Sequence, residues 1–263
     1  MTNLTSLTRH SHRAGPRIRL TDEISLPAAR VHEACGRARR CFAMMLASKT
    51  AGHIYWITPA WLPDQLNCEG VRRFIDPARI THLHPGRPED VLWCMEEILR
   101  SGAVPLVVAD IPGLPGLTQV RRMHLAAERG LHEGICQPVG LLLTPGAGGA
   151  QGVESRWQME PDHKVGSEGW SLERVRARTA PQKRWRIVHQ PGADSETPFS
   201  SRAVAGAGAG FIPAPADRED LHQEFEGFFH LVVAGRKDQG HSRHHDSRFK
   251  VGHSVSLPLR SQV

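Results

Sequence analysis

Apolar residues recur along the first half of the chain in blocks that alternate between strand and helix spacing. Short runs of β-branched, aromatic and aliphatic residues predict strands at 29–35, 53–58, 79–84, 104–110 and 139–144. Between them, apolar residues three or four positions apart predict helices at 38–49, 63–75, 87–102 and 117–130, the last ended by Gly130. Strands that alternate with helices are typical of a parallel sheet with helices on its faces.

The pattern changes after the Gly-rich loop PGAGGAQG. Three short alternating segments, at 153–159, 170–179 and 183–188, predict an antiparallel meander. Beyond them, Pro, Gly, Ala and Ser dominate a composition that cannot bury enough apolar surface to fold. We therefore predict a flexible lead (1–25), an α/β core domain with a parallel sheet flanked by helices and a C-terminal β-meander (26–188), and a low-complexity, largely disordered tail (189–263).

Composition narrows the classes of function. The chain has 263 residues and a net charge of +6, and residues 1–189 hold 25 Lys and Arg against 18 Asp and Glu. Such a surface favours nucleic acid or acidic protein partners. The first residues lack the apolar block of a secretory signal, and no apolar run is long enough to cross a membrane, which predicts a cytoplasmic protein. Five cysteines without a C-x-x-C pair predict neither a disulfide framework nor a metal site.

The turn after the first core strand has the frame of a phosphate-binding loop. Gly36 follows the strand, and four residues separate it from the places where such a loop carries a second glycine, a lysine and a Ser/Thr hydroxyl. Those places hold Cys41, Phe42 and Ala43. The lysine neutralises phosphate charge and the hydroxyl binds magnesium. We therefore predict that no nucleotide binds, with the Phe42 ring pointing where phosphates would lie.

Three arginines, Arg37, Arg39 and Arg40, lie inside this turn. They leave two interpretations open: an anion site of another kind, or a tight strand-to-helix turn with a solvated basic face. A strand, this turn, a helix and the later apolar strand VPLVVAD together resemble the layout of the RecA-like NTPase fold. In that fold an aspartate at the position of Asp110 contacts magnesium through water. Gly36, Arg37, Arg39, Arg40 and Asp110 are therefore predicted to form a vestigial loop without a cofactor.

The resemblance extends, in order, over residues 26–188. The segments VHEACGRARRCFAMMLA, HIYWITPAWLPDQLN, DVLWCMEEILRSGAVPLVVADIPGLPGLTQVRRMHLAAERG and GLLLTPGAGGAQGVESRWQM resemble ImuA. ImuA is the RecA-like accessory protein of bacterial inducible mutagenesis cassettes, and it is often grouped with the cell-division inhibitor SulA. The tail has no part in the resemblance.

This resemblance implies a role in the SOS response to DNA damage. It implies as protein partners an inactive Y-family polymerase homologue and an error-prone replicative-type polymerase, with RecA as a further partner. It also implies weak binding to DNA. The expected function is that of a non-catalytic accessory protein in SOS-induced mutagenic translesion DNA synthesis. Two alternatives remain: a SulA-like inhibitor of cell division and a divergent RecA-like ATPase.

The motifs of RecA itself argue against an enzyme. Ala60 falls near the place of the catalytic glutamate, and Thr144 with Pro145 replaces the glutamine that senses the γ-phosphate. Phosphoryl transfer depends on charge stabilisation and a positioned water. Since the lysine, the metal ligand and the glutamate are all replaced, we expect no catalytic residues and no cofactor.

A second candidate site lies in the segment RVRARTAPQKRWR. Its basic residues alternate with apolar and small ones and include a tryptophan, as in strands that contact single-stranded DNA by stacking and charge. The same pattern suits the solvent face of a two-faced strand, with the tryptophan in the core. The predicted contact residues are Arg174, Arg176, Arg178, Arg184 and Trp185.

Overall fold

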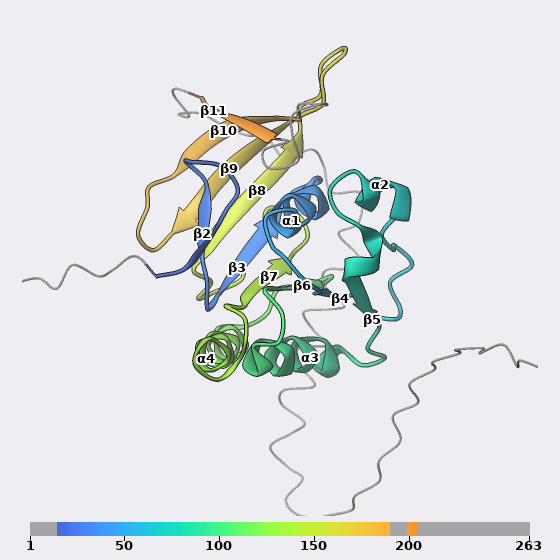
Figure 1. The fold of residues 1–263 in the computed structure, drawn as a ribbon, viewed down its shortest axis with the longest axis vertical. Coiled ribbons are helices and arrows are strands. Elements are labelled where there is room, and N and C mark those ends of the chain that lie inside the picture. The colour runs from blue at the N-terminus through green and yellow to red at the C-terminus, as the bar shows by residue number, and fades with distance from the viewer. Residues whose placement is uncertain (1–14, 190–198, 205–263) are drawn as a thin grey trace, which may run out of the picture.

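The computed structural model describes residues 15–189 and 199–204, which form a mixed α/β fold around a nine-stranded sheet (Figure 1). The strand order is β11-β10-β9-β8-β3-β7-β6-β4-β5. Strands β8, β3, β7, β6, β4 and β5 run parallel, whereas β8 to β11 pair antiparallel. The predicted fold class, a parallel sheet flanked by helices and followed by a β-meander, is confirmed.

Every core element predicted from the periodicity is present. The parallel strands are β3 (Arg30–Cys35), β4 (Ile54–Ile57), β5 (Ile80–Leu83), β6 (Leu106–Asp110), β7 (Val139–Leu143) and β8 (Ser155–Pro161). The meander continues with β9 (Gly169–Ala177), β10 (Lys183–His189) and β11 (Phe199–Ala203). The helices are α1 (Arg39–Ala47), α2 (Cys68–Arg72), the 3₁₀ turn η1 (Pro77–Arg79), α3 (Pro88–Ser101) and α4 (Leu117–Glu133).

Both faces of the sheet are covered, which explains the unbroken apolar runs. Helices α3 and α4 lie on one face, and α1 with α2 lies on the other (Figure 1). Every residue of β6 and β7 is buried between these two layers. None of the helices in the described part of the chain is long and apolar enough to cross a membrane. The five cysteines all lie in this part and are unpaired.

Three strands lie in segments for which the sequence predicts none. β1 (Arg17–Arg19) and β2 (Ser25–Pro27) form a hairpin, largely inside the segment predicted as a flexible lead, and β11 lies beyond residue 188. Leu20, Ile24 and Leu26 from the hairpin are buried in the same core as the meander. Strands of three residues are too short to show a period, and their burial comes from the meander they cover. The rest of the predicted tail lies outside the described residues.

Gly130 does not end the last helix as predicted, because α4 continues to Glu133. The glycine is needed for packing: a Cβ atom at Gly130 would lie 2.0 Å from the carbonyl oxygen of Leu99 on α3. The two helices therefore approach each other at a position that only glycine fits.

Replacing this glycine tests the helix contact. We expect Gly130→Ala to lower the free energy of unfolding by about 1–3 kcal/mol, because the added methyl group overlaps the α3 backbone. Gly70→Ala on α2 is the matched control: nothing lies within 4 Å of a Cβ there, so we expect a gain of about 0.5 kcal/mol. Urea unfolding of both variants measures the difference, and equal midpoints would contradict the packing.

Candidate functional site

The candidate site is the turn between β3 and α1, at the carboxyl ends of the parallel strands, where α/β folds usually bind ligands. Gly36 begins the turn with a φ of 87°. A Cβ atom at this position would lie 2.4 Å from the carbonyl oxygen of Met159 on β8. Both the positive φ and the close approach of β8 require glycine here.

The backbone N–H groups from Gly36 to Arg39 all have partners inside the protein. Gly36 donates to the carbonyl oxygen of Gly146 (3.0 Å) and Ala38 to that of Met159 (3.0 Å), while Arg39 donates to that of Gly36 (3.3 Å). The N–H of Arg37 donates to Glu160 Oε1 at 3.3 Å. A phosphate-binding loop works through free N–H groups that converge on an oxyanion. This turn is therefore closed on itself, with the Glu160 carboxylate as its anion.

The side chains of Arg37 and Glu160 reinforce this closure. Arg37 Nε donates to Glu160 Oε2 at 2.9 Å, and the Arg37 side chain is otherwise exposed. Glu160 lies on β8, so the strand that approaches Gly36 also supplies the carboxylate. An incoming phosphate would have to displace this carboxylate against like-charge repulsion.

Asp110, at the end of β6, is paired with arginines of the same turn. Arg40 Nε lies 2.5 Å from Asp110 Oδ2, and Arg39 Nη2 lies 3.5 Å from Asp110 Oδ1. The carboxylate is only 2% exposed. A buried charge needs a partner, and here the partner is a protein guanidinium. The structure thus brings together Gly36, Arg37, Arg39, Arg40 and Asp110 at the ends of β3 and β6.

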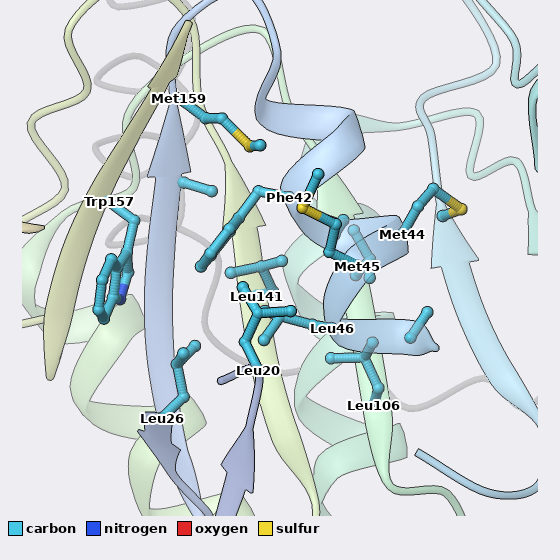
Figure 2. Packing of buried hydrophobic residues seen from close by; sticks show 14 of the residues in the cluster. Leu20, Leu26, Phe42, Met44, Met45, Leu46, Leu106, Leu141, Trp157 and Met159 are labelled. Atoms are coloured by element: carbon cyan, nitrogen blue, oxygen red, sulfur yellow. The ribbon is translucent and has the colours of Figure 1, made fainter. Parts of the chain in front are cut away.

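Phe42 differs from the prediction, because its ring does not occupy the space of the phosphates. It is fully buried under α1, with its ring stacked on Trp157 at a centroid distance of 5.6 Å (Figure 2). Position 42 lies on the sheet-facing side of α1, so an apolar side chain there packs in the hydrophobic core. The lysine position of the frame is therefore a packing position in this protein.

The sequence analysis missed a buried carboxylate, Glu33 on β3. Its Oε1 accepts hydrogen bonds from Thr144 Oγ1 (2.7 Å) and from the N–H groups of Gly149 (2.8 Å) and Ala150 (3.0 Å). Its Oε2 accepts from Arg156 Nε at 2.5 Å. The only signal in the sequence was a lone glutamate inside the apolar strand VHEAC. These hydrogen bonds hold the Gly-rich loop against β3, and the Thr144 hydroxyl is one of the donors.

His32, the neighbour of Glu33, points to the opposite face of the sheet. Its Nδ1 lies 2.7 Å from Ser155 Oγ and its Nε2 lies 2.9 Å from the carbonyl oxygen of Pro27. Trp157 Nε1 donates to the same Ser155 Oγ at 2.7 Å. A neutral ring that donates from Nε2 and accepts at Nδ1 satisfies this chain of bonds. Burial lowers the pKa of His32 to about 4, although the bond to Pro27 opposes the shift.

The predicted contact residues of the meander do not share one surface. Trp185 is 1% exposed and packs against Trp157 at 5.9 Å, so its ring is not accessible to a nucleobase. Arg184 Nε donates to Glu173 Oε2 at 3.0 Å. Arg174 lies over the rings of Trp157 and Trp185, and the side chains of Arg176 and Arg178 are exposed.

Other predicted positions carry no ligand-binding arrangement. Ala60 is exposed in the loop after β4, and its N–H donates to the carbonyl oxygen of Pro85. Within residues 15–189 and 199–204, no three His, Cys, Asp or Glu side chains gather as metal ligands would.

The fold and the turn together define an α/β protein with the frame of a phosphate-binding loop, closed by its own side chains. No family model matches the chain, and no curated protein matches it. Among solved structures, SulA from Pseudomonas aeruginosa matches with a TM-score of 0.36 and 24% sequence identity, over 46% of this chain and 100% of that chain.

Replacing Glu33 tests the buried network. We expect Glu33→Gln to lower the free energy of unfolding by about 3–5 kcal/mol, because Arg156 then loses its buried carboxylate. The double variant Glu33→Gln/Arg156→Met should recover much of this loss. Glu128→Gln is the matched control, since its partner Arg30 is partly exposed and such pairs contribute less than about 1 kcal/mol. Chemical unfolding measures all three, and equal losses for Glu33→Gln and Glu128→Gln would contradict the network.

Acid should destabilise the protein through His32. Because its pKa is about 4 in the folded state, against 6.5 for an unperturbed histidine, the unfolded chain binds more protons between these values. The free energy of unfolding is therefore highest above about pH 6.5. It decreases as the pH falls towards 4, by at most about 3 kcal/mol. We expect His32→Gln to flatten this dependence of the urea midpoint, whereas His53→Gln, at an exposed position, leaves it unchanged. An equally steep fall in both variants would count against His32.

Proposed function

We propose that the chain is a non-catalytic accessory protein in SOS-induced mutagenic translesion DNA synthesis. It acts through protein contacts with an error-prone polymerase complex, with RecA, or with both. The resemblance of residues 26–188 to ImuA motivates the pathway. The observation that carries the non-catalytic part is the closed turn at Gly36, whose consecutive N–H groups are bonded within the protein.

The electrostatics of the turn support the same conclusion. Phosphoryl transfer needs a cation on the β- and γ-phosphates, a metal ion and a positioned water. Arg40 and Arg39 neutralise Asp110, the carboxylate that would otherwise be available to a hydrated magnesium ion. The charges of the site balance without a nucleotide, and two of the charged groups, Asp110 and Glu160, are largely buried.

Protein contacts have suitable anchors on the helical face. Trp93 on α3 is 49% exposed and Leu125 on α4 is 66% exposed. Tryptophan is enriched among the residues that dominate binding energy at protein interfaces. We therefore place the partner contact on α3 and α4, with Trp93 as its anchor.

Recovery of partners from damage-induced cells tests this function. We expect the tagged full chain to recover the polymerase homologue or RecA, and Trp93→Ala to reduce the recovery at least about tenfold, as for an interface anchor. Val165→Ala, which truncates a fully exposed side chain in the β8–β9 turn, is the control and should recover as much as the wild type. Failure of the folded wild-type chain to recover either partner would overturn the pathway.

Calorimetry with magnesium and ATP separates this proposal from a divergent ATPase. We expect no saturable heat, and a dissociation constant below about 1 mM would overturn the non-catalytic part. A lysine at position 42 is unsuitable as a test, because it would enter the core beside Trp157.

A further inference from the structure

Two histidines lie at the open edge of the sheet. β5 is the last strand in the strand order and pairs with β4, and His82 lies in it while His84 follows its last residue (Figure 1). Residues two apart in an extended segment point to the same face. The two rings are parallel, with their centroids 6.1 Å apart. We call His82 and His84 the histidine pair.

The rings of the histidine pair are accessible to a solute. Ile80, two residues before His82 on β5, packs against the apolar core that α1 covers. His82 and His84 lie further along the chain and are exposed. The core therefore ends before the histidine pair, and both imidazoles face solvent.

The protein orients the ring of His84. Its Nδ1 lies 3.3 Å from the carbonyl oxygen of Thr58. Because a carbonyl oxygen only accepts hydrogen bonds, Nδ1 carries the proton, and the neutral ring has its free lone pair on Nε2. Histidines that bind metal ions usually donate their other ring N–H to a carbonyl or carboxylate in the same way. The bond to Thr58 thus prepares Nε2 of His84 as a ligand.

The ring of His82 has no such restraint. It forms no hydrogen bond with another residue of the described chain, so rotation about χ1 and χ2 breaks none. Burial, and then the charge of His84, lowers the pKa of His82. The ring is therefore neutral near pH 7, and a metal ion does not have to displace a proton from its lone pair.

The chemistry of the histidine pair fits a transition-metal ion. Imidazole is a preferred ligand of Zn²⁺, Ni²⁺ and Cu²⁺, whereas Mg²⁺ and Ca²⁺ prefer oxygen. Metal–nitrogen distances of about 2.0–2.1 Å require two nitrogens about 3–3.5 Å apart, which a rotation of the exposed His82 ring towards His84 supplies. No third His, Cys, Asp or Glu side chain joins them in the described part of the chain, so water completes the coordination.

We propose that the histidine pair chelates one divalent ion of the zinc, nickel and copper class, with one nitrogen from each ring. The site lies at the edge of the sheet, outside the closed turn and outside the helical face of α3 and α4. This inference goes beyond the proposed protein contacts and does not depend on them.

Unfolding of the full chain in the presence of Ni²⁺ is the first test. An ion that binds the folded chain in preference to the unfolded one raises the urea midpoint. Above its dissociation constant, each tenfold rise in free Ni²⁺ should lower the unfolding equilibrium constant by up to about tenfold. An unchanged midpoint up to about 1 mM Ni²⁺ would overturn the proposal.

Single variants locate the ion. His82→Gln and His84→Gln each remove one ligand and should weaken Ni²⁺ binding at least about tenfold, since even the outer partners of a ligand contribute that much. His53→Gln, at an exposed position before β4, is the control and should respond to Ni²⁺ as the wild type does. Histidines beyond the described residues are the same in every variant, so their binding cancels. An equal response in all three variants would contradict the proposal.

Chemical modification tests the site in the wild-type chain, without a substitution. Diethyl pyrocarbonate acylates free imidazole nitrogens, and peptide mass spectrometry reports each histidine separately. We expect Ni²⁺ to protect His82 and His84 over the same range of concentration and to leave His53 reactive. Protection of only one of the pair would mean a single-histidine contact, and protection of neither would mean a surface stack alone. Either result would overturn the chelate.

Discussion

The buried carboxylate of Glu33 is the interaction on which the closed turn depends. Three donors besides Arg156 converge on it, and they come from the end of β7 and from the Gly-rich loop. Because an unpaired buried charge costs several kcal/mol, the loop has to return to this point. Its return places the carbonyl oxygen of Gly146 against the N–H of Gly36. Glu33 on β3 thus positions the loop whose carbonyl oxygen bonds to the turn at Gly36.

The charged groups of the turn, which has the frame of a phosphate-binding loop, are paired within the protein. Glu160 takes the place of an anion beside the N–H groups, and Arg40 takes the place of a cation beside Asp110. Both replacements come from side chains that are fixed by neighbouring strands or by α1. The polar groups of the frame therefore join β3, β6, β8 and α1 to one another.

Arginine has two distinct roles in this structure. Where a carboxylate lies on a neighbouring element, as for Arg40, Arg156 or Arg186, the guanidinium joins elements together. The guanidinium of Arg174 instead lies over the rings of Trp157 and Trp185 and donates to the carbonyl oxygen of Pro181, neighbours that orient it but do not neutralise it. The same residue type therefore joins elements at some positions of the meander and packs against aromatic rings at another.

The sequence by itself determined the α/β class and the order of the core elements along the chain, because hydrophobic periodicity is a local property. For the turn it named Gly36, its arginines and Asp110, but not Glu160, which reaches the turn from β8. It also showed that position 42 cannot supply a cation. Only the tertiary structure decided where side chains point, since Phe42 and Trp185 lie in the core. It also decided that α4 continues past Gly130 to Glu133. The short strands β1 and β2 form because they cover the meander. The partners of Glu33, from Thr144 to Arg156, lie more than 100 residues away from it in the chain. No local pattern specifies such contacts, because they arise only when the sheet brings distant strands together.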